Sequence, residues 1–334
     1  MSSPTPPPHL SDAAALTLRR GHLWIAGSPQ PTPAGHVQKG QMYVEWLAPE
    51  RVTRPFPLVL VHGGGGQGTD WLVTPDGRPG WAYRFASEGY AVYVVDRPGH
   101  GRSPYHPDTL GAPGGATTSE AAAFLFASPQ DDSHTQWPWD GEAGSAELEQ
   151  LAASMAFLLE DAEQSQRLDG ERLGALLERT GPAVLITHSA GAPAGWLALN
   201  AHPELVNGIV AIEPMGPPYF DVPGFPALPW GITATPLAVD PPVREVSELA
   251  QGLEGHRVVG FDTAPVLIVA GAVSAFGQGA GPAVAAFVNE AGGDATFLSL
   301  ADEDIDGNGH GLMFEANSER TIEPVLTWLE RIGR

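Results

Sequence analysis

Residues 183–191 read Ala-Val-Leu-Ile-Thr-His-Ser-Ala-Gly and form the most informative segment of the chain. A short apolar strand runs directly into a serine, and a turn of small residues leads into a predicted helix at 192–200. A nucleophile elbow needs this order, because the tight turn aims the serine hydroxyl away from the backbone and admits only small neighbours. The usual pattern is G-x-S-x-G, and Thr187 replaces its first glycine. We predict Ser189 as a catalytic nucleophile; the alternative is a strand that ends in a serine at an ordinary glycine turn.

Short apolar runs on both sides of this segment predict a mostly parallel sheet. They are continuous rather than alternating, as in strands covered by helices on both faces, and they occupy residues 58–61, 91–95, 183–187, 208–212, 266–270 and 295–300. Helices are predicted at residues 81–88, 145–164, 171–178, 192–200, 245–253, 282–290 and 319–331. Two antiparallel strands, 16–25 and 41–47, come first. Repeated strand–helix units of this kind indicate an α/β fold.

The chain is predicted to form one domain with two insertions. Residues 1–12 are proline-rich and predict a flexible lead, and residues 13–334 form the domain. The segments at about 104–144 and 214–262 are long and irregular, which is typical of lids and binding loops. We therefore expect them to form a lid or the wall of a pocket.

Composition excludes several classes of partner and chemistry. The formal net charge of −22 disfavours nucleic acid and anionic membrane surfaces. The absence of cysteine excludes disulfides, thiol nucleophiles and cysteine-based zinc sites, and a single lysine makes Schiff-base chemistry a poor fit. No apolar run is long enough to span a membrane, and no signal peptide is visible. We expect a cytoplasmic protein, with secretion left open if a leader has been removed.

A glycine run follows the strand at 58–61 and predicts an oxyanion hole. The sequence His62-Gly-Gly-Gly-Gly66 lets backbone N–H groups approach a substrate without side chains in the way. In this architecture one donor comes from that loop and the other from the residue after the nucleophile, so we predict Gly64 and Ala190. The alternatives are a flexible glycine loop and a phosphate cradle, and the latter lacks the lysine of a P-loop.

The base is predicted at His310, in Asp306-Gly-Asn-Gly-His310 after the last strand. A histidine on this loop can reach the serine across the sheet edge, and the order serine before histidine is the one expected. His100 is a weaker candidate, His62 is expected to pack or hydrogen-bond, and His188 is expected to point elsewhere. The acidic run 302–308 resembles the start of a calcium loop, but Met313 stands where the bidentate glutamate should be, so we predict no metal and no cofactor.

The orienting acid is predicted at Glu213. Most proteins with this arrangement place an acid after the strand at 266–270, where residues 271–277 contain none. Glu213 ends the apolar run one strand earlier, and a carboxylate there is costly unless an imidazole N–H pairs with it. The alternatives are a solvated strand-end carboxylate at Glu213, with the acid supplied by Asp302, Asp304 or Asp306.

Aromatic residues in the two insertions predict the wall of an apolar pocket beside the glycine run. The aromatic residues are Trp137, Trp139, Phe220, Phe225 and Trp230, and Gly65 of the glycine run is expected to line the same pocket. Local packing of these aromatic side chains is the alternative.

Together these segments resemble the α/β-hydrolase superfamily from about Gln41 to the C-terminus. More narrowly, they resemble a small group of bacterial carboxylesterases whose triad acid is a glutamate after the sixth strand. The resemblance rests on Gln41-Met-Tyr-Val, His62-Gly, Thr74-Pro-Asp-Gly-Arg-Pro-Gly-Trp81, Gly89-Tyr, Gly99-His-Gly-Arg-Ser103, His188-Ser-Ala-Gly191, Ile212-Glu-Pro214 and Gly307-Asn-Gly-His310. It implies an α/β-hydrolase fold with helices on both faces of the sheet, and it gives Ser189, His310 and Glu213 the triad roles. It also gives Gly64 and Ala190 the oxyanion hole, and it suggests a homodimer.

The predicted function is cleavage of a small-molecule carboxylic ester through an acyl-enzyme. A lactonase, an amidase, a C–C hydrolase or a perhydrolase could use the same triad. A non-catalytic binding protein on this scaffold is the alternative from another class, although such proteins typically lose a triad member, and none is missing from this sequence.

Overall fold

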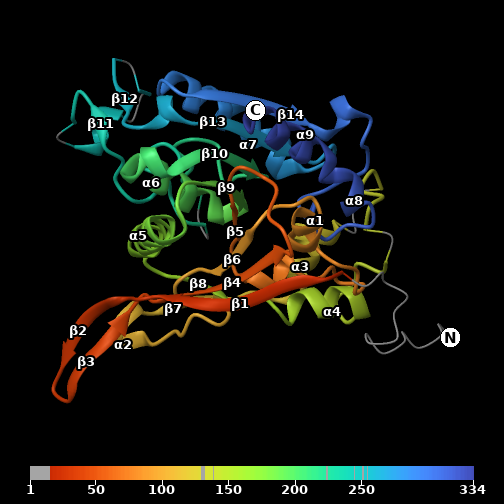
Figure 1. The fold of residues 1–334 in the computed structure, drawn as a ribbon, viewed down its shortest axis with the longest axis horizontal. Coiled ribbons are helices and arrows are strands. Elements are labelled where there is room, and N and C mark those ends of the chain that lie inside the picture. Colours follow the sequence, from red (N-terminus) through yellow and green to blue (C-terminus); the bar gives the residue numbers. More distant parts are fainter. Residues whose placement is uncertain are drawn as a thin grey trace.

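The computed structural model describes residues 16–128, 132–137, 139–222, 225–243, 245–249, 252–253 and 255–334. The predicted flexible lead at 1–12 lies outside the described residues. An eight-stranded sheet forms the centre of the described chain, in the order β1-β4-β6-β5-β9-β10-β13-β14 (Figure 1). β4 pairs antiparallel with β1 and β6, and every other neighbouring pair is parallel. The predicted mostly parallel sheet is confirmed.

The strands of this sheet are β1 (Leu18–Ile25), β4 (Met42–Pro49), β5 (Leu58–Val61), β6 (Val92–Asp96), β9 (Ala183–His188), β10 (Val206–Ile212), β13 (Pro265–Ala270) and β14 (Asp294–Ser299). The main helices are α1 (Trp81–Ser87), α5 (Ala162–Thr180), α6 (Ala192–Ala201), α7 (Ala275–Glu290) and α9 (Glu323–Ile332).

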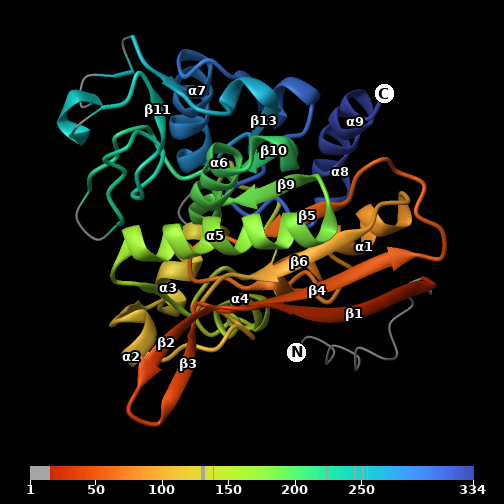
Figure 2. The same ribbon diagram turned by 60° about the vertical axis from the view of Figure 1, so that its left-hand side comes forward.

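Helices cover both faces of the sheet because its strands are apolar on both sides. Along β5, Leu58 and Leu60 pack with side chains of α1 and α9, whereas Val59 and Val61 pack with α5, α6 and α7. Figure 2 shows α5 lying across its face of the sheet. Full burial of each such side chain contributes about 1.5–3 kcal/mol, so the carboxyl ends of the parallel strands are held in a rigid frame.

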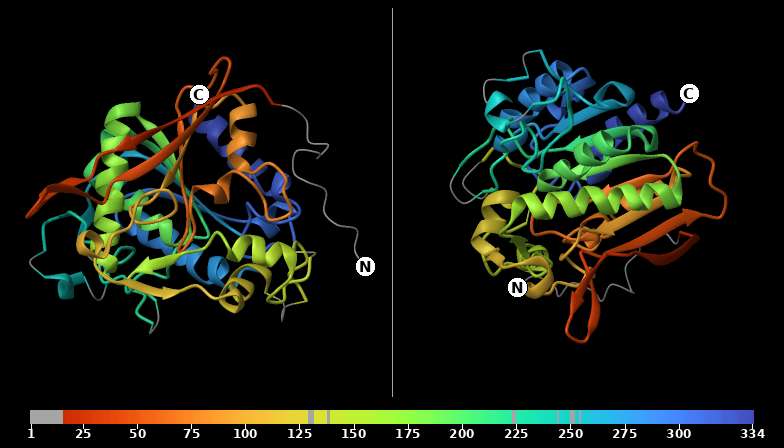
Figure 3. Two further views of the ribbon diagram at one scale, coloured as in Figure 1. Left: turned by 90° about the horizontal axis from the view of Figure 1, so that it is seen from below. Right: turned by 90° about the vertical axis from the view of Figure 1, so that its left-hand side faces the viewer.

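Smaller elements lie in the connections. They are β2 (Ser28–Thr32), β3 (Gly35–Lys39), η2 (Gly68–Trp71), α2 (Pro107–Leu110), β7 (Pro113–Ala116), α3 (Ser119–Ala122), η3 (Ala123–Ala127), α4 (Ala146–Ala152), β8 (Phe157–Leu159), η4 (Ser189–Gly191), η5 (Pro203–Leu205), β11 (Val239–Asp240), η6 (Val246–Leu249), β12 (Arg257–Val258), η7 (Phe261–Thr263), η8 (Leu300–Glu303) and α8 (Ser318–Thr321). β2 and β3 form a hairpin that extends from the body (Figure 3), between the two strands predicted at 16–25 and 41–47.

The helix predicted at 145–164 is wrong. The chain forms α4, turns, pairs as β8 with β7, and only then begins α5, whose first turn is capped when the Asp161 carboxylate accepts from the Gln164 amide. α5 then continues through Gly170, where two helices had been expected. A Cβ on Gly170 would lie 2.8 Å from Leu197 Cβ, so glycine permits close packing of α5 on α6.

Two other helix predictions differ from the structure. The helix expected at 245–253 is reduced to the short η6. α7 begins at Ala275 rather than at Pro282, because the Ser274 hydroxyl caps its first turn by accepting from the Gly277 amide. Within the described part of the chain, no helix is both long and apolar enough to cross a bilayer.

Candidate active site

Ser189 lies where β9 passes through η4 into α6. Its φ angle is 49°, in the left-handed region that strains a residue with a side chain. A Cβ at position 191 would lie 2.2 Å from the carbonyl oxygen of His62, so only glycine allows the two loops to approach. The segment therefore has the strained turn geometry of a nucleophile elbow.

Thr187, the departure from G-x-S-x-G, is accommodated by α6. Its side chain is fully buried, and a Cβ on Gly195 would lie 3.1 Å from the Thr187 methyl carbon. A glycine on the helix thus supplies the room that the strand glycine would otherwise give.

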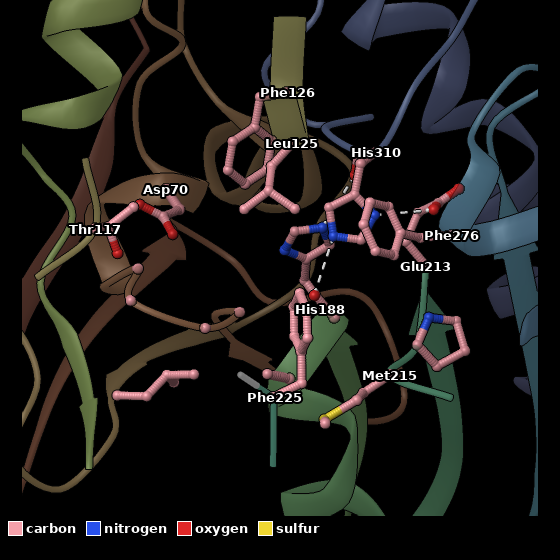
Figure 4. A pocket seen from close by; sticks show the side chains of 18 of the residues that line it. Asp70, Thr117, Leu125, Phe126, His188, Glu213, Met215, Phe225, Phe276 and His310 are labelled. Atoms are coloured by element: carbon pink, nitrogen blue, oxygen red, sulfur yellow. Dashed lines mark hydrogen bonds and ion pairs between the residues drawn. The ribbon is translucent and has the colours of Figure 1, made fainter. Parts of the chain in front are cut away.

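His310 bridges Ser189 and Glu213, and Figure 4 shows the His310 ring facing Glu213. The Ser189 Oγ atom lies 3.0 Å from Nε2, and Nδ1 lies 3.0 Å from Glu213 Oε2. When Nδ1–H donates to the carboxylate, Nε2 is left free to accept the serine proton. The alternative acids are exposed and do not bond to His310: Asp302, Asp304 and Asp306.

The buried Glu213 carboxylate is held by the segment that follows β13. The Gly271 amide donates to Oε1 at 2.5 Å, and the Ser274 hydroxyl donates to Oε2 at 2.5 Å. A Cβ on Gly277 would lie 2.2 Å from Oε1, so the first turn of α7 closes directly over the carboxylate. The segment that lacks an acid therefore supplies the donors that fix Glu213.

A buried polar cluster supports the loop that carries His310. It consists of His134, Asn308 and Glu315, and we call it the Glu315 cluster. Glu315 Oε1 accepts from the Gly309 amide at 2.8 Å and lies 2.9 Å from His134 Nε2, while Asn308 donates to Oε2. The other His134 nitrogen lies 3.0 Å from a backbone carbonyl oxygen. No local sequence pattern indicates this cluster, because His134 lies in the irregular insertion.

His188 also contacts His310, which corrects the prediction that its side chain points elsewhere. His188 Nε2 donates to the carbonyl oxygen of His310 at 3.1 Å, and the two ring centres are 4.8 Å apart. Burial lowers the pKa of His188 to about 3, so its ring is neutral. His188 therefore helps to position the His310 backbone.

The predicted oxyanion donors lie side by side. A Cβ on Gly64 would be 3.2 Å from the Cβ of Ala190, and both residues line the pocket. The Gly64 N–H donates to no other group among the described residues. This amide is therefore free to bind a substrate oxygen.

A second buried cluster lies behind the glycine run. It consists of His62, Arg97 and Asp169, and we call it the Arg97 cluster. The Arg97 guanidinium donates to the Gly63 carbonyl at 2.9 Å, to Asp169 at 3.0 Å and to the Ala190 carbonyl at 3.3 Å. One buried cation thus holds both loops that carry predicted oxyanion donors.

His62 completes this arrangement. Its Nε2 accepts from the Arg97 amide at 3.0 Å, which leaves Nδ1–H to donate to the Gly63 carbonyl at 2.9 Å. Burial lowers the pKa of His62 well below its usual value, in agreement with a neutral ring. Because C=O and N–H of one trans peptide point in opposite directions, two donors on the Gly63 oxygen fix the Gly64 N–H on the other side.

His100, the weaker candidate for the base, packs behind the site. Its ring centre lies 5.3 Å from that of His62, and burial lowers its pKa to about 3. The structure does not bring His100 to Ser189. Burial also raises the pKa of Asp169 to about 6, although Arg97 opposes this shift.

The pocket at Ser189 is mostly apolar, and only some of the residues predicted to line it do so. Gly65, Phe220 and Phe225 line it, and both insertions contribute to its wall. Trp137, Trp139 and Trp230 do not. Trp137 is buried in the core and packs edge-on against Trp139, and Trp230 packs against the core on the α5 face. Other apolar lining residues carried no sequence signal: Leu125, Phe126, Leu151, Met155, Leu158, Met215, Phe276 and Phe314.

The acidic loop at 302–308 does not form a recognisable cation site. Among the residues that the structure describes, no group of three or more His, Asp or Glu side chains is arranged to hold a metal.

Comparisons with known proteins agree with this fold. The model of the α/β-hydrolase fold family matches residues 57–248. A fungal protein named "Probable secreted lipase phiG" (Fungal sp., strain ATCC 74256) is 34% identical over 320 residues, covering 89% of this chain and 88% of the relative. The solved structure of a novel bacterial esterase superimposes with a TM-score of 0.72 at 24% identity, covering 97% of this chain and 99% of that one.

This chain therefore belongs to the α/β-hydrolase superfamily and is an enzyme of that class. The fold implied by the sequence resemblance is confirmed. The cytoplasmic location and the homodimer stay predictions.

Proposed function

We propose that this protein is a carboxylesterase that cleaves small-molecule esters through an acyl-enzyme on Ser189. The observation that supports the proposal is the continuous hydrogen-bonded chain from Ser189 through His310 to the buried Glu213, at the wall of an apolar pocket. The name of the fungal relative, a lipase, also fits chemistry on esters.

In the first step His310 Nε2 takes the proton of Ser189, and the serine oxygen attacks the ester carbonyl carbon. The carbonyl oxygen becomes an oxyanion beside the Gly64 and Ala190 amides. The ester C–O bond then breaks, and His310 returns the proton to the leaving alcohol. Glu213 stabilises the imidazolium and keeps Nδ1 as the donor throughout.

In the second step water replaces the alcohol. His310 takes a proton from this water, and the hydroxide attacks the acyl carbon. The bond between that carbon and Ser189 Oγ then breaks, His310 returns the proton to Oγ, and the acid is released. No metal or cofactor is required for either step.

The proposal is tested with p-nitrophenyl esters of increasing acyl length, assayed with wild type and Ser189→Ala. We expect turnover by wild type, with Ser189→Ala close to the uncatalysed rate. Glu213→Gln should lower kcat by roughly 10³–10⁴, because the imidazole loses its orienting carboxylate. Full activity of Glu213→Gln would show that another group orients His310.

A panel of lactones, amides and C–C substrates separates the alternatives that share the triad. If a lactone, an amide or a C–C substrate were turned over faster than every ester, the protein would be a lactonase, an amidase or a C–C hydrolase rather than a carboxylesterase.

A further inference from the structure

One corner of the apolar pocket is polar, and the proposed ester hydrolysis does not use it. It is formed by Asp70, on η2 just after the glycine run, and by Thr117 from the first insertion. Figure 4 shows both side chains on the wall opposite Glu213 and Phe276. The rest of the lining is mostly leucine, methionine, phenylalanine and glycine.

Asp70 is buried but has little to bond with. Its side chain is 9% exposed, and its hydrogen bond within the described chain is from the Gln67 amide to Oδ2, at 3.2 Å. No Lys, Arg or His side chain of the described residues forms an ion pair with it. The bond from Gln67 accounts for Oδ2 as part of the η2 turn, and no described residue donates to Oδ1. Because Asp70 lines the pocket, Oδ1 can accept a hydrogen bond from a bound molecule.

Two glycines keep this corner open to the pocket. A Cβ on Gly66 would lie 2.1 Å from Asp70 Oδ2, and a Cβ on Gly65 would lie 3.2 Å from the Thr117 hydroxyl oxygen. Any side chain at these positions would therefore collide with or cover the polar groups. The Thr117 hydroxyl donates to the Ala156 carbonyl at 2.9 Å, so towards a ligand this oxygen can only accept.

Both groups of this corner thus offer acceptors to a bound molecule. The charged groups that act on Asp70 most strongly are Asp96, which disfavours its ionised form, and Arg97, which favours it. Burial outweighs both and raises the pKa of Asp70 to about 7. A donor supplied by a ligand would satisfy Oδ1.

We infer that Asp70 and Thr117 form a subsite for a hydrogen-bond donor of the substrate, so that preferred esters carry a hydroxyl or primary ammonium group. This inference rests on the proposed esterase function. It makes the substrate an amphipathic ester: apolar where it meets the aromatic wall, with a donor on the part that lies along Gly65 and Gly66. Asp70 acts here in substrate selection and takes no part in the acyl transfer.

The test compares matched esters that differ only at one end. The end group is methyl, hydroxyl, primary ammonium or trimethylammonium, placed on the acyl chain in one series and on the alcohol in the other. The trimethylammonium ester carries charge but no N–H donor, so it separates hydrogen bonding from charge attraction. The measured quantity is kcat/KM for each ester divided by that for its methyl partner.

The assays are run above pH 8, where a carboxyl group of pKa about 7 is ionised. We expect a hydroxyl or primary ammonium ester to be favoured there by at least about 10-fold in one series, as a hydrogen bond to a charged group implies. The trimethylammonium ester should lack this preference. Asp70→Leu should remove the preference, Asp70→Asn should reduce it, and Thr117→Val should weaken it. The matched control is Glu120→Gln, which removes one negative charge from an exposed site on α3 and should keep the wild-type ratios.

Labelling of Ser189 by a fluorophosphonate is measured in every variant, together with the melting temperature. Absence of labelling in wild type would count against the proposed esterase itself. Normal labelling with no preference for donor-bearing esters in either series, or with a preference that survives in both Asp70→Asn and Asp70→Leu, would overturn the subsite alone. If Asp70→Leu does not fold, Asp70→Asn and Thr117→Val decide the outcome.

Discussion

The Arg97 cluster and the Glu315 cluster hold opposite sides of the same site, and they are built from different parts of the chain. The Arg97 cluster joins the ends of β5 and β6 to α5, all within the sheet and its covering helix. The Glu315 cluster joins the loop after η8 to His134 of the first insertion. In each cluster a buried carboxylate lies behind a loop that contains glycine. The carboxylate is that of Asp169 behind the loop at Gly63, and that of Glu315 behind the loop at Gly309. Each loop must be held in one conformation.

The difference lies in the side chain that faces each carboxylate. Arginine stays charged at any pH the protein meets, and its planar group binds three acceptors at once in the Arg97 cluster. The His134 ring instead bridges two oxygens, one of the Glu315 carboxylate and one of a backbone carbonyl. We conclude that the oxyanion side is held by a guanidinium that binds three acceptors, and the histidine side by an imidazole that lies between two oxygens.

The largest effect is expected from Arg97→Met. This change frees the peptide between Gly63 and Gly64 and leaves Asp169 buried without a partner. We expect kcat to fall by about 10²–10³, as for loss of an oxyanion donor. The free energy of unfolding should fall by about 3–5 kcal/mol, as for a broken buried ion pair. Both are measured by steady-state kinetics and urea unfolding.

The double variant Arg97→Met/Asp169→Leu separates the two consequences. Removing both charges should recover much of the stability, while kcat stays low because the Gly63 carbonyl still lacks one of its two donors. Recovery of kcat together with stability would mean that Arg97 acts only through folding.

A smaller effect is expected from Glu315→Gln. The glutamine oxygen can still accept from the Gly309 amide, but the negative charge opposite His134 is lost. We expect kcat to fall by about 10-fold with little change in KM, since the catalytic loop is loosened rather than displaced. The control is Glu303→Gln, an exposed change at the end of η8. A fall as large as that of Arg97→Met would contradict the proposed difference between the clusters.

Asp70 is a third buried carboxyl group to compare with those of Asp169 and Glu315. Unlike Asp169, it forms no ion pair with a described residue. Its pKa is raised from 3.8 to about 7, so between these values the folded state keeps a proton that the unfolded state releases. The free energy of unfolding should therefore fall as pH rises from about 4 to 7. Asp70→Asn should reduce this fall by about 1–2 kcal/mol, measured by urea unfolding across pH.

Asp169, whose pKa is raised to about 6, contributes with the same sign, so part of the slope should remain in Asp70→Asn. An unchanged slope would mean that Asp70 is ionised throughout this range in the folded protein.

The smallest effect is expected from Trp139→Leu. Trp139 packs on Trp137, away from the pocket, so kcat/KM on p-nitrophenyl esters should stay within about 2-fold while the free energy of unfolding falls by about 1–2 kcal/mol. If Trp139→Leu raised KM only for esters with long acyl chains, Trp139 would have to contact the substrate, which contradicts its position against Trp137.

Much of the framework could be predicted from sequence because it depends on local patterns. Continuous apolar runs gave the strands, and the carboxyl ends of parallel strands must meet at one edge, which brings Ser189, Glu213 and His310 together. Thr187 could be tolerated in the elbow only through Gly195, a contact between strand and helix that no local pattern reveals.

The features that were missed depend on contacts between irregular segments. The wall of the pocket is set by where residues 104–144 and 214–262 fold back, so the tryptophans expected there pack elsewhere. The predicted helices leave a gap at 165–170, whereas α5 is continuous there because Gly170 packs closely against Leu197, a contact that helix propensity does not reveal. His134 and Glu315 are 181 residues apart, and nothing in either local sequence pairs them.

The central claim is that His310 makes Ser189 a nucleophile, and peptide mapping after treatment with a fluorophosphonate tests it most directly. We predict an adduct on Ser189 in the wild-type protein, at a rate that falls by several orders of magnitude in His310→Ala. An adduct on another residue, or equally fast modification of Ser189 without His310, would contradict the account.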